Sequence, residues 1–308
     1  MDLRVSHDTE YRYAQPVHGA HHIAHLSPPD TVTQQVLSHD LTVTPMPEAD
    51  TWSQRQDAFG NHVVQWQTVG AHEALRVQAT STVRTWALPP VDDATCGWAQ
   101  AAEHYAYQSA QANDPAAAFT FASTHVPKAA AFADYAASSF SPDARLVDAA
   151  LDLLRRMDQD FSYVSQSTTI HTPALAALQA RRGVCQDFAH IMLACLRSLG
   201  LAARYVSGYL LTEVPEGQVR LRGSDASHAW VALHVPGLDA GQHAWLHLDP
   251  TNHRSGWGSP GPDYVTLACG RDFADVSPLR GVLQGGAAHT LRVGVTVEPL
   301  SERPSAGG

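Results

Sequence analysis

The chain has few cysteines, few charges and no long apolar run, and each shortage excludes a class of protein. Its cysteines are widely scattered, so they have neither metal-ligand spacing nor the pattern of a disulfide framework. No apolar stretch is long enough to span a bilayer. Charged residues make up 16% of the chain and the net charge is −10, so neither nucleic acid nor a membrane is an expected partner. The four cysteines are Cys96, Cys185, Cys195 and Cys269.

The rest of the composition is typical of a globular enzyme. Hydrophobic residues make up 44% of the 308 positions, which is enough for a sizeable core in one large domain or in two. The N-terminus enters an alternating pattern at once, without the basic and apolar regions of a signal peptide, so we expect a cytoplasmic protein. The oligomeric state is not predicted by the sequence.

Residues 1–85 have a β pattern. Alternate positions from Leu3 to Tyr13 suit a half-buried strand, and similar short segments follow, separated by proline and glycine turns. Such spacing predicts a small antiparallel β-sandwich. Among its histidines, His21, His22 and His25 lie close together, but no carboxylate or cysteine completes a metal-ligand set. We therefore expect surface or packed histidines there.

The middle of the chain is predicted to be helical. A connection at 86–115 is framed by proline pairs and acidic turns. An Ala-rich stretch from Pro115 to Ser139 favours helix, and another helix is expected from Pro173 to Ala180.

The most informative residue is Cys185. It follows the turn Arg181-Arg182-Gly183 and opens an amphipathic run that ends at Gly200, so it lies in the first turn of a helix. The free N–H groups and the dipole at a helix start favour an anion, and the thiolate is the reactive form of cysteine. A buried structural cysteine is the alternative, and from this stretch alone the two are comparable. Asp187 in the same turn is interpreted as a structural cap, and Cys195 falls in the apolar stripe.

A base and its orienting acid are predicted from the strands that follow. The second strand, 225–235, and the third, 244–250, are joined by a short turn-like loop, so we expect a hairpin. If Val235 lies opposite Gln242, then His228 lies opposite Asp249 on the same face, about 4.5–5.5 Å apart between Cβ atoms. The register is assumed from the loop composition. The three residues then suit a Cys-His-Asp arrangement.

These motifs resemble those of the bacterial transglutaminase-like superfamily. The resemblance covers nearly the whole chain and implies an α+β fold, with a papain-like transglutaminase core whose nucleophile helix packs on an antiparallel sheet. The matching stretches are 182–190, 203–209, 225–230, 248–252, 270–278 and 280–282, with 57–61 in the β region. We expect a β-sandwich at 1–85, a linker at 86–115, the catalytic core at 116–285, a C-terminal strand at 286–299 and a disordered tail at 300–308. The sequence does not choose which part's sheet the C-terminal strand joins.

The resemblance also implies roles for the site residues. Cys185 would be the nucleophile, His228 the base and Asp249 the acid that orients it. Acyl transfer from an amide to an amine or water, through a thioester, is the first hypothesis. A peptidase or small amidase with the same triad, and a non-catalytic protein-binding module, are the alternatives. We expect a peptide, protein or small amide substrate and no cofactor or metal.

Stabilisation of the oxyanion is only partly predicted. The backbone N–H of Cys185 is the expected first donor. Gln186 and Tyr205 are the candidates for the second, and the sequence does not choose between them.

Overall fold

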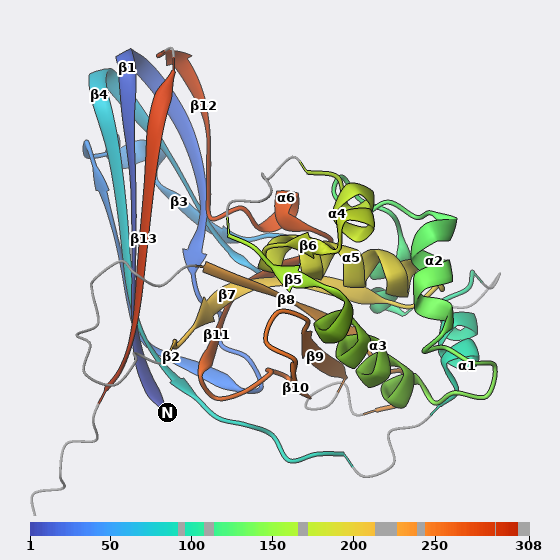
Figure 1. Ribbon diagram of the computed structural model, residues 1–308. Coiled ribbons are helices and arrows are strands. Elements are labelled where there is room, and N and C mark those ends of the chain that lie inside the picture. The colour runs from blue at the N-terminus through green and yellow to red at the C-terminus, as the bar shows by residue number, and fades with distance from the viewer. Residues whose placement is uncertain are drawn as a thin grey trace, which may run out of the picture.

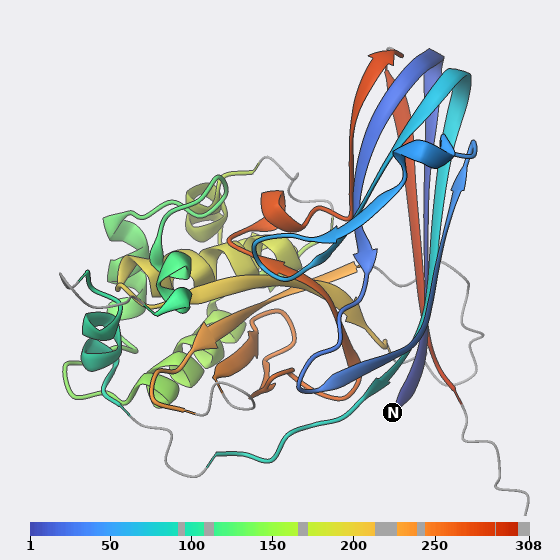
Figure 2. The same cartoon turned by 180° about the vertical axis from the view of Figure 1, so that it is seen from behind.

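The protein has two parts that pack side by side, an elongated β part and a helical part built around a second sheet (Figure 1). This computed structural model describes residues 1–91, 96–107, 114–165, 172–212, 227–238, 244–286 and 288–300. Both views show the upper end of the β part rising beyond the helical part (Figures 1 and 2).

Within the described residues, the β part is one six-stranded antiparallel sheet with the order β12-β1-β4-β2. Strand β13 also pairs with β1, and β3 pairs with β4. The strands are β1 (Asp2–Ser27), β2 (Gln34–Thr44), β3 (Ser53–Gln56), β4 (His62–Thr85), β12 (Leu279–Gly285) and β13 (His289–Pro299).

The two longest strands fold this single sheet over on itself. The β1–β4 pairing is interrupted between Arg12 and Val17 and again before Gly19, and β4 turns at Gly70, whose φ is +92°. This bend lies at the top of the β part, and after it β1 runs back down as a second layer (Figure 1). Apolar side chains from both halves, such as Leu75 and Trp66, share one core. The predicted β-sandwich is therefore made by bending one sheet rather than by stacking two.

The C-terminal strands belong to this β part. β13 pairs with the first half of β1 and β12 with the second half. The predicted core range of 116–285 is thus wrong at its end, because Leu279–Gly285 completes the N-terminal sheet. A strand predicted at 286–299 is present as β13, but the sequence pattern did not identify the strand with which it pairs. Of the tail predicted at 300–308, residues 301–308 lie outside the described residues.

The second part begins earlier than predicted and is less continuously helical. Trp98 and Ala101 of α1, inside the predicted linker 86–115, pack in the main core. The Ala-rich stretch 115–139 is helical only at its two ends, because Pro127 cannot supply a helix-interior hydrogen bond. The helices are α1 (Trp98–His104), η2 (Pro115–Thr120), α2 (Ala130–Ala137), α3 (Leu146–Asp160), α4 (Ala174–Ala180), α5 (Cys185–Ser198) and α6 (Phe273–Val276).

Helix α5 is the centre of this part. Its side chains from Asp187 to Arg197 are all buried, although the sequence pattern predicts one apolar face. Helices α2 and α4 cover the side that does not pack against the sheet. Buried Arg197 is tolerated because its guanidinium donates to the carbonyls of Ala203 and Arg271.

The second sheet carries the other site residues. In the described residues it has five antiparallel strands in the order β10-β9-β8-β7-β11. They are β7 (Ala203–Leu210), β8 (Ser227–His234), β9 (Trp245–Asp249), β10 (Arg254–Trp257) and β11 (Tyr264–Gly270). On the β7–β11 side, Tyr209, Val265 and Leu267 pack into the core of the β part. The α+β fold with its papain-like core is thus present, and the two parts share a buried interface.

Candidate active site

Cys185 lies at the first position of α5, as the sequence predicts. The Asp187 carboxylate accepts a hydrogen bond of 2.8 Å from the backbone N–H of Val184, the residue before the helix. Asp187 is 3% exposed, so its predicted capping role agrees with the geometry. A Cβ at Gly183 would lie 2.7 Å from the Asp187 carboxylate. The glycine before the cysteine therefore leaves room for the cap.

His228 and Asp249 lie together on one face of the sheet. The Nε2 atom of His228 is 2.7 Å from the Oδ2 atom of Asp249. His228 is 9% exposed and Asp249 is fully buried. The pairing thus joins a strand start to a strand end, which are 21 residues apart in sequence.

The hairpin register differs from the predicted one by two residues. Val231 pairs with Leu248, and the hairpin closes where Val235 donates to Ala244 rather than opposite Gln242, which lies outside the described residues. The loop is thus two residues longer than assumed. A shift of two keeps every side chain on its face, so His228 and Asp249 still meet, as diagonal rather than direct neighbours.

Several further groups fix the Asp249 carboxylate. Tyr264 donates its hydroxyl to Oδ2 at 2.7 Å, and the Asn252 side-chain amide donates to the same oxygen at 2.8 Å. The backbone N–H of Thr251 donates to Oδ1 at 2.9 Å. Burial by itself raises the pKa of Asp249, but the bonds from His228, Asn252 and Tyr264 hold it below its usual value. Asp249 is therefore a buried, ionised acceptor.

Sequence reasoning missed Tyr264 and gave Asn252 no role. Asn252 belongs to the Leu248–Asn252 motif, so the turn after β9 carried a weak signal for it. Tyr264 lies on β11, at the opposite edge of the sheet from β9 in strand order. Tyr264 therefore comes into contact with Asp249 only because of the tertiary fold, and no local sequence pattern links the two residues.

His228 contacts Cys185 as well as Asp249. Because Nε2 faces the carboxylate, Nδ1 is the nitrogen left for the thiol. Burial by itself lowers the pKa of His228, but hydrogen bonds and charge interactions with Asp249 and Cys185 outweigh it and raise the pKa to about 10. The imidazolium form is thus favoured at neutral pH, next to a group that can carry a negative charge.

Gly208 leaves room for the Trp230 ring, which stacks on His228. Gly208 pairs with His228 across β7 and β8, and a Cβ there would lie 2.5 Å from the Trp230 ring. Trp230 stacks on His228 at 6.1 Å and donates its indole N–H to His247 at 2.8 Å. His247 is thus a buried partner of Trp230.

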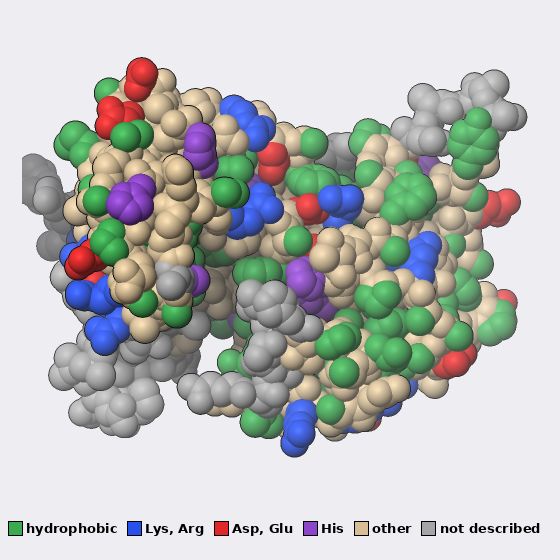
Figure 3. Space-filling model, turned by 90° about the horizontal axis from the view of Figure 1, so that it is seen from above, with side chains coloured by type: hydrophobic (Ala, Val, Ile, Leu, Met, Phe, Trp, Pro, Cys, Tyr) green, Lys and Arg blue, Asp and Glu red, His purple; other side chains and the backbone are tan. Residues whose placement is uncertain are grey.

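Cys185 and His228 border a cleft between the two parts of the molecule, and Asp249 lies buried behind His228. The cleft has a volume of about 310 Å³ and is lined by Cys185, Gln186, Tyr205 and His228 from the core. His7, Thr9 and Tyr11 of β1, together with Leu291 and Val293 of β13, form the opposite wall. Seen from above, a hollow lies between the β part and the helical part (Figure 3). Both candidate oxyanion donors, Gln186 and Tyr205, are therefore at the cleft, and the choice between them stays a prediction.

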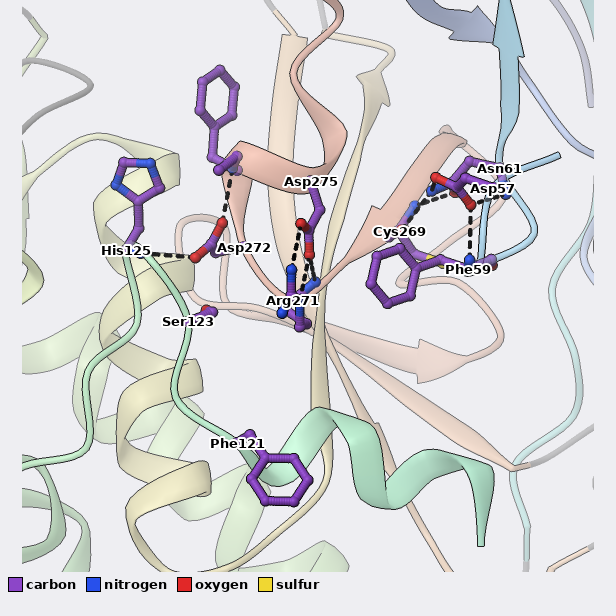
Figure 4. Close-up of polar contacts among 12 residues, drawn as sticks. Asp57, Phe59, Asn61, Phe121, Ser123, His125, Cys269, Arg271, Asp272 and Asp275 are labelled. Carbon is purple, nitrogen blue, oxygen red and sulfur yellow. Dashed lines mark hydrogen bonds and ion pairs between the residues drawn. The ribbon is translucent and has the colours of Figure 1, made fainter. Parts of the chain in front are cut away.

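The loop that carries α6 forms the end of the cleft and is tied down by polar contacts (Figure 4). Asp272 is 1% exposed and accepts hydrogen bonds from the backbone N–H groups of His125 and Ala274. Phe273 lines the cleft and donates its N–H to His190 of α5 at 3.3 Å.

Other buried histidines, and the second cysteine of α5, have structural positions. Burial lowers the pKa of His190 to about 3, and its ring stacks on His125, so it serves the α6 loop. Cys195 is fully buried, which raises its pKa to about 12, and its predicted place in the core is confirmed. His22 and His25 are buried in β1. Across the described residues, no group of three or more His, Cys, Asp or Glu side chains is placed to hold a metal ion.

Two family models match the chain. Residues 3–84 match the bacterial transglutaminase-like N-terminal region, and residues 130–250 match the transglutaminase-like superfamily. The second match contains Cys185, His228 and Asp249.

Relatives extend the likeness along the whole chain. An uncharacterized protein of Mycobacterium tuberculosis is 39% identical over 298 residues, covering 96% of this chain and 92% of its own. A protein-glutamine gamma-glutamyltransferase of Pseudomonas aeruginosa is 33% identical over 134 residues, covering 41% of this chain and 18% of its own. Among solved structures, a putative cysteine protease from Cytophaga hutchinsonii superposes with a TM-score of 0.69 at 21% identity, covering 99% of this chain and 93% of its own. The chain therefore belongs to the bacterial transglutaminase-like superfamily, a family of cysteine enzymes.

Proposed function

We propose that the protein is a transglutaminase-like cysteine enzyme that transfers the acyl group of an amide through a thioester on Cys185. The observation that carries the proposal is the placement of His228. Its ring bonds to the buried Asp249 carboxylate on one side and to the Cys185 thiol on the other. This is the order of groups that activates a cysteine nucleophile and orients its base.

In the first step, the Cys185 thiolate attacks the carbonyl carbon of the amide. The backbone N–H of Cys185, at the start of α5, donates to the oxyanion of the tetrahedral intermediate. His228 is held as imidazolium by Asp249 and gives its proton to the leaving amine. The C–N bond breaks, the amine departs, and a thioester on Cys185 remains.

In the second step, an amine or a water molecule attacks the thioester. Neutral His228 takes the proton of the incoming nucleophile, and the Cys185 thiolate leaves. An amine gives a new amide, whereas water gives an acid. The open cleft between β1, β13 and the core gives either acceptor access to the thioester.

Mass spectrometry of a glutamine-containing peptide, incubated with the enzyme and a primary amine, tests the proposal. The expected product has lost ammonia and gained the amine, and the Cys185→Ala variant gives none. The amine must be added because the chain has a single lysine, Lys128, to offer as an internal acceptor. Turnover by the Cys185→Ala variant would overturn the proposal.

The same experiment separates the alternatives. Cleavage fragments would identify a peptidase, and loss of ammonia without gain of the amine would identify an amidase. Failure of Cys185 to react with iodoacetamide at neutral pH would favour a non-catalytic binding module.

A cytoplasmic location remains part of the proposal, and cell fractionation tests it. All four cysteines are free thiols in the structure, which fits a reducing compartment.

A further inference from the structure

The cleft beside Cys185 continues into a second cavity at the open edge of the bent sheet. Strands β12 and β13 each pair with β1 and form this edge (Figure 1). The second cavity, called here the edge chamber, has a volume of about 170 Å³. Tyr11 and Leu279 line both the cleft and the edge chamber. The edge chamber therefore adjoins the cleft that holds Cys185.

Aromatic rings form one wall of the edge chamber. Tyr11 and Tyr13 stack with their planes 9° apart and their centroids 6.3 Å apart. The His289 ring lies 5.3 Å from that of Tyr11 and 6.3 Å from that of Tyr13. Leu75 and Leu283 add apolar surface. An aromatic guest would find ring edges and faces at contact distances here.

His22 lines the opposite wall, and one of its ring nitrogens is buried with no partner in the described part of the chain. His22 is 3% exposed, and among the described residues its Nε2 atom has no hydrogen-bond partner. Its ring is fixed by stacking on Trp66 at 5.2 Å, and it packs closely over Gly281, where a Cβ would lie 2.7 Å from Nδ1. Burial, with the nearby His72 and His21, lowers the pKa of His22 to about 4, so the ring is neutral at pH 7.

We propose that the edge chamber is a specificity subsite for a phenolic side chain, such as a tyrosine of the substrate near the amide that Cys185 attacks. This inference rests on the proposed function for its link to catalysis. A hydroxyl both donates and accepts, so it satisfies His22 Nε2 in either tautomer of the ring. A purely apolar guest would leave that atom unpaired, and a charged guest would lose its hydration. The volume suits one ring, since cavities of about 150 Å³ bind benzene.

Binding of 4-fluorophenol to the Cys185→Ala protein, followed by fluorine NMR, tests the edge chamber without catalysis. Saturable binding is expected, and Leu283→Trp, which fills the edge chamber, abolishes it. Val282→Trp is the matched control, because Val282 is the preceding residue of β12 and is 76% exposed. Absence of saturable binding, or equal effects of the two tryptophans, would overturn the proposal.

A second variant tests the hydrogen bond. The protein with His22 is expected to bind 4-fluorophenol about tenfold more tightly than fluorobenzene, because one net hydrogen bond contributes about that factor. In His22→Leu the two probes bind equally, and the fold is retained because the replaced Nε2 had no partner. An unchanged preference in this variant would rule out His22 as the recognising group.

Peptide turnover connects the edge chamber to the reaction. Among glutamine peptides that differ at one neighbouring position, tyrosine is expected to give a kcat/KM about tenfold above alanine, and Leu283→Trp removes this advantage while the alanine peptide is still processed. Equal turnover of both peptides by the wild type would overturn the subsite. If no peptide is processed but 4-fluorophenol binds as expected, the proposed function fails and the binding site stands.

Discussion

At the scale of single residues, the negative charge of Asp249 is expected to hold His228 in its imidazolium form. Asp249→Asn keeps the shape but removes the charge that holds the imidazolium and selects its tautomer. We expect kcat to fall by roughly 10³–10⁴-fold. Steady-state kinetics with the glutamine peptide measure it, with thiol titration of Cys185 to show an intact site. A loss of less than tenfold would mean that Asp249 does not orient the base.

His228 makes the free energy of unfolding depend on pH. Its pKa is raised from 6.5 to about 10 in the folded protein, so the folded state binds the proton more tightly than the unfolded chain. The resulting stabilisation is fully present below pH 6.5 and is lost as the pH rises through about 10. We expect the stability gap between wild type and His228→Gln to shrink from pH 6 to pH 10 in urea unfolding. A constant gap would contradict the raised pKa.

Tyr264 supports the acid rather than the thiol. Tyr264→Phe removes the 2.7 Å bond to Asp249, so we expect a loss of about 1–2 kcal/mol in the free energy of unfolding and a reduced kcat. Tyr135→Phe is the matched control, since Tyr135 donates a 2.8 Å bond to Asp160, away from the site. It should lower stability with kcat unchanged. Equal kcat effects of the two variants would argue against a role for Tyr264 in the site.

At the scale of elements, the start of α5 decides where the thiol lies. Gly183→Ala places a Cβ 2.7 Å from the Asp187 carboxylate, so the cap must move and Cys185 moves with it. We expect a loss of about 1–3 kcal/mol in stability and slower alkylation of Cys185 by iodoacetamide. Gly97→Ala, which meets its nearest atom at 3.9 Å, should change neither. Normal alkylation in Gly183→Ala would show that the cap adapts.

At the scale of the whole molecule, buried histidines make the fold sensitive to acid. Burial lowers the pKa of His7 and His22 to about 4 and that of His190 to about 3, from 6.5. The unfolded chain therefore binds more protons in this range, and stability falls as the pH drops from 6.5 towards 4. Urea unfolding at several pH values measures the slope, and His22→Leu should flatten it. An identical slope in that variant would contradict the assignment.

The two parts of the molecule also depend on each other. His7 of β1 bonds to the hydroxyl of Tyr209 of β7 at 2.9 Å, and the sheet that starts at the N-terminus is completed by β12 and β13 from the C-terminus. The same sheet supplies one wall of the cleft. The β part therefore contributes one wall of the cleft, while Cys185 and His228 belong to the core.

By itself, the sequence predicted the elements that carry Cys185, His228 and Asp249. Periodicity located the strands of 1–85, the helix from Cys185 to its stop near Gly200, and the two strands that carry His228 and Asp249. These are local properties, because each depends on which residues stand two, three or four positions apart. The pairing of histidine with aspartate was also predictable, since a two-residue shift in register leaves the face unchanged.

Only the tertiary structure decided what lies around these residues. The bend that folds one sheet into two layers, the return of β12 and β13 to β1, the Tyr264 bond to Asp249 and the edge chamber at His22 all join segments distant in sequence. Strand partners, side-chain cavities and buried hydrogen bonds depend on packing, on which an alternating pattern carries no information. The sequence thus placed a cysteine at the start of a helix, and packing made the cleft that it faces.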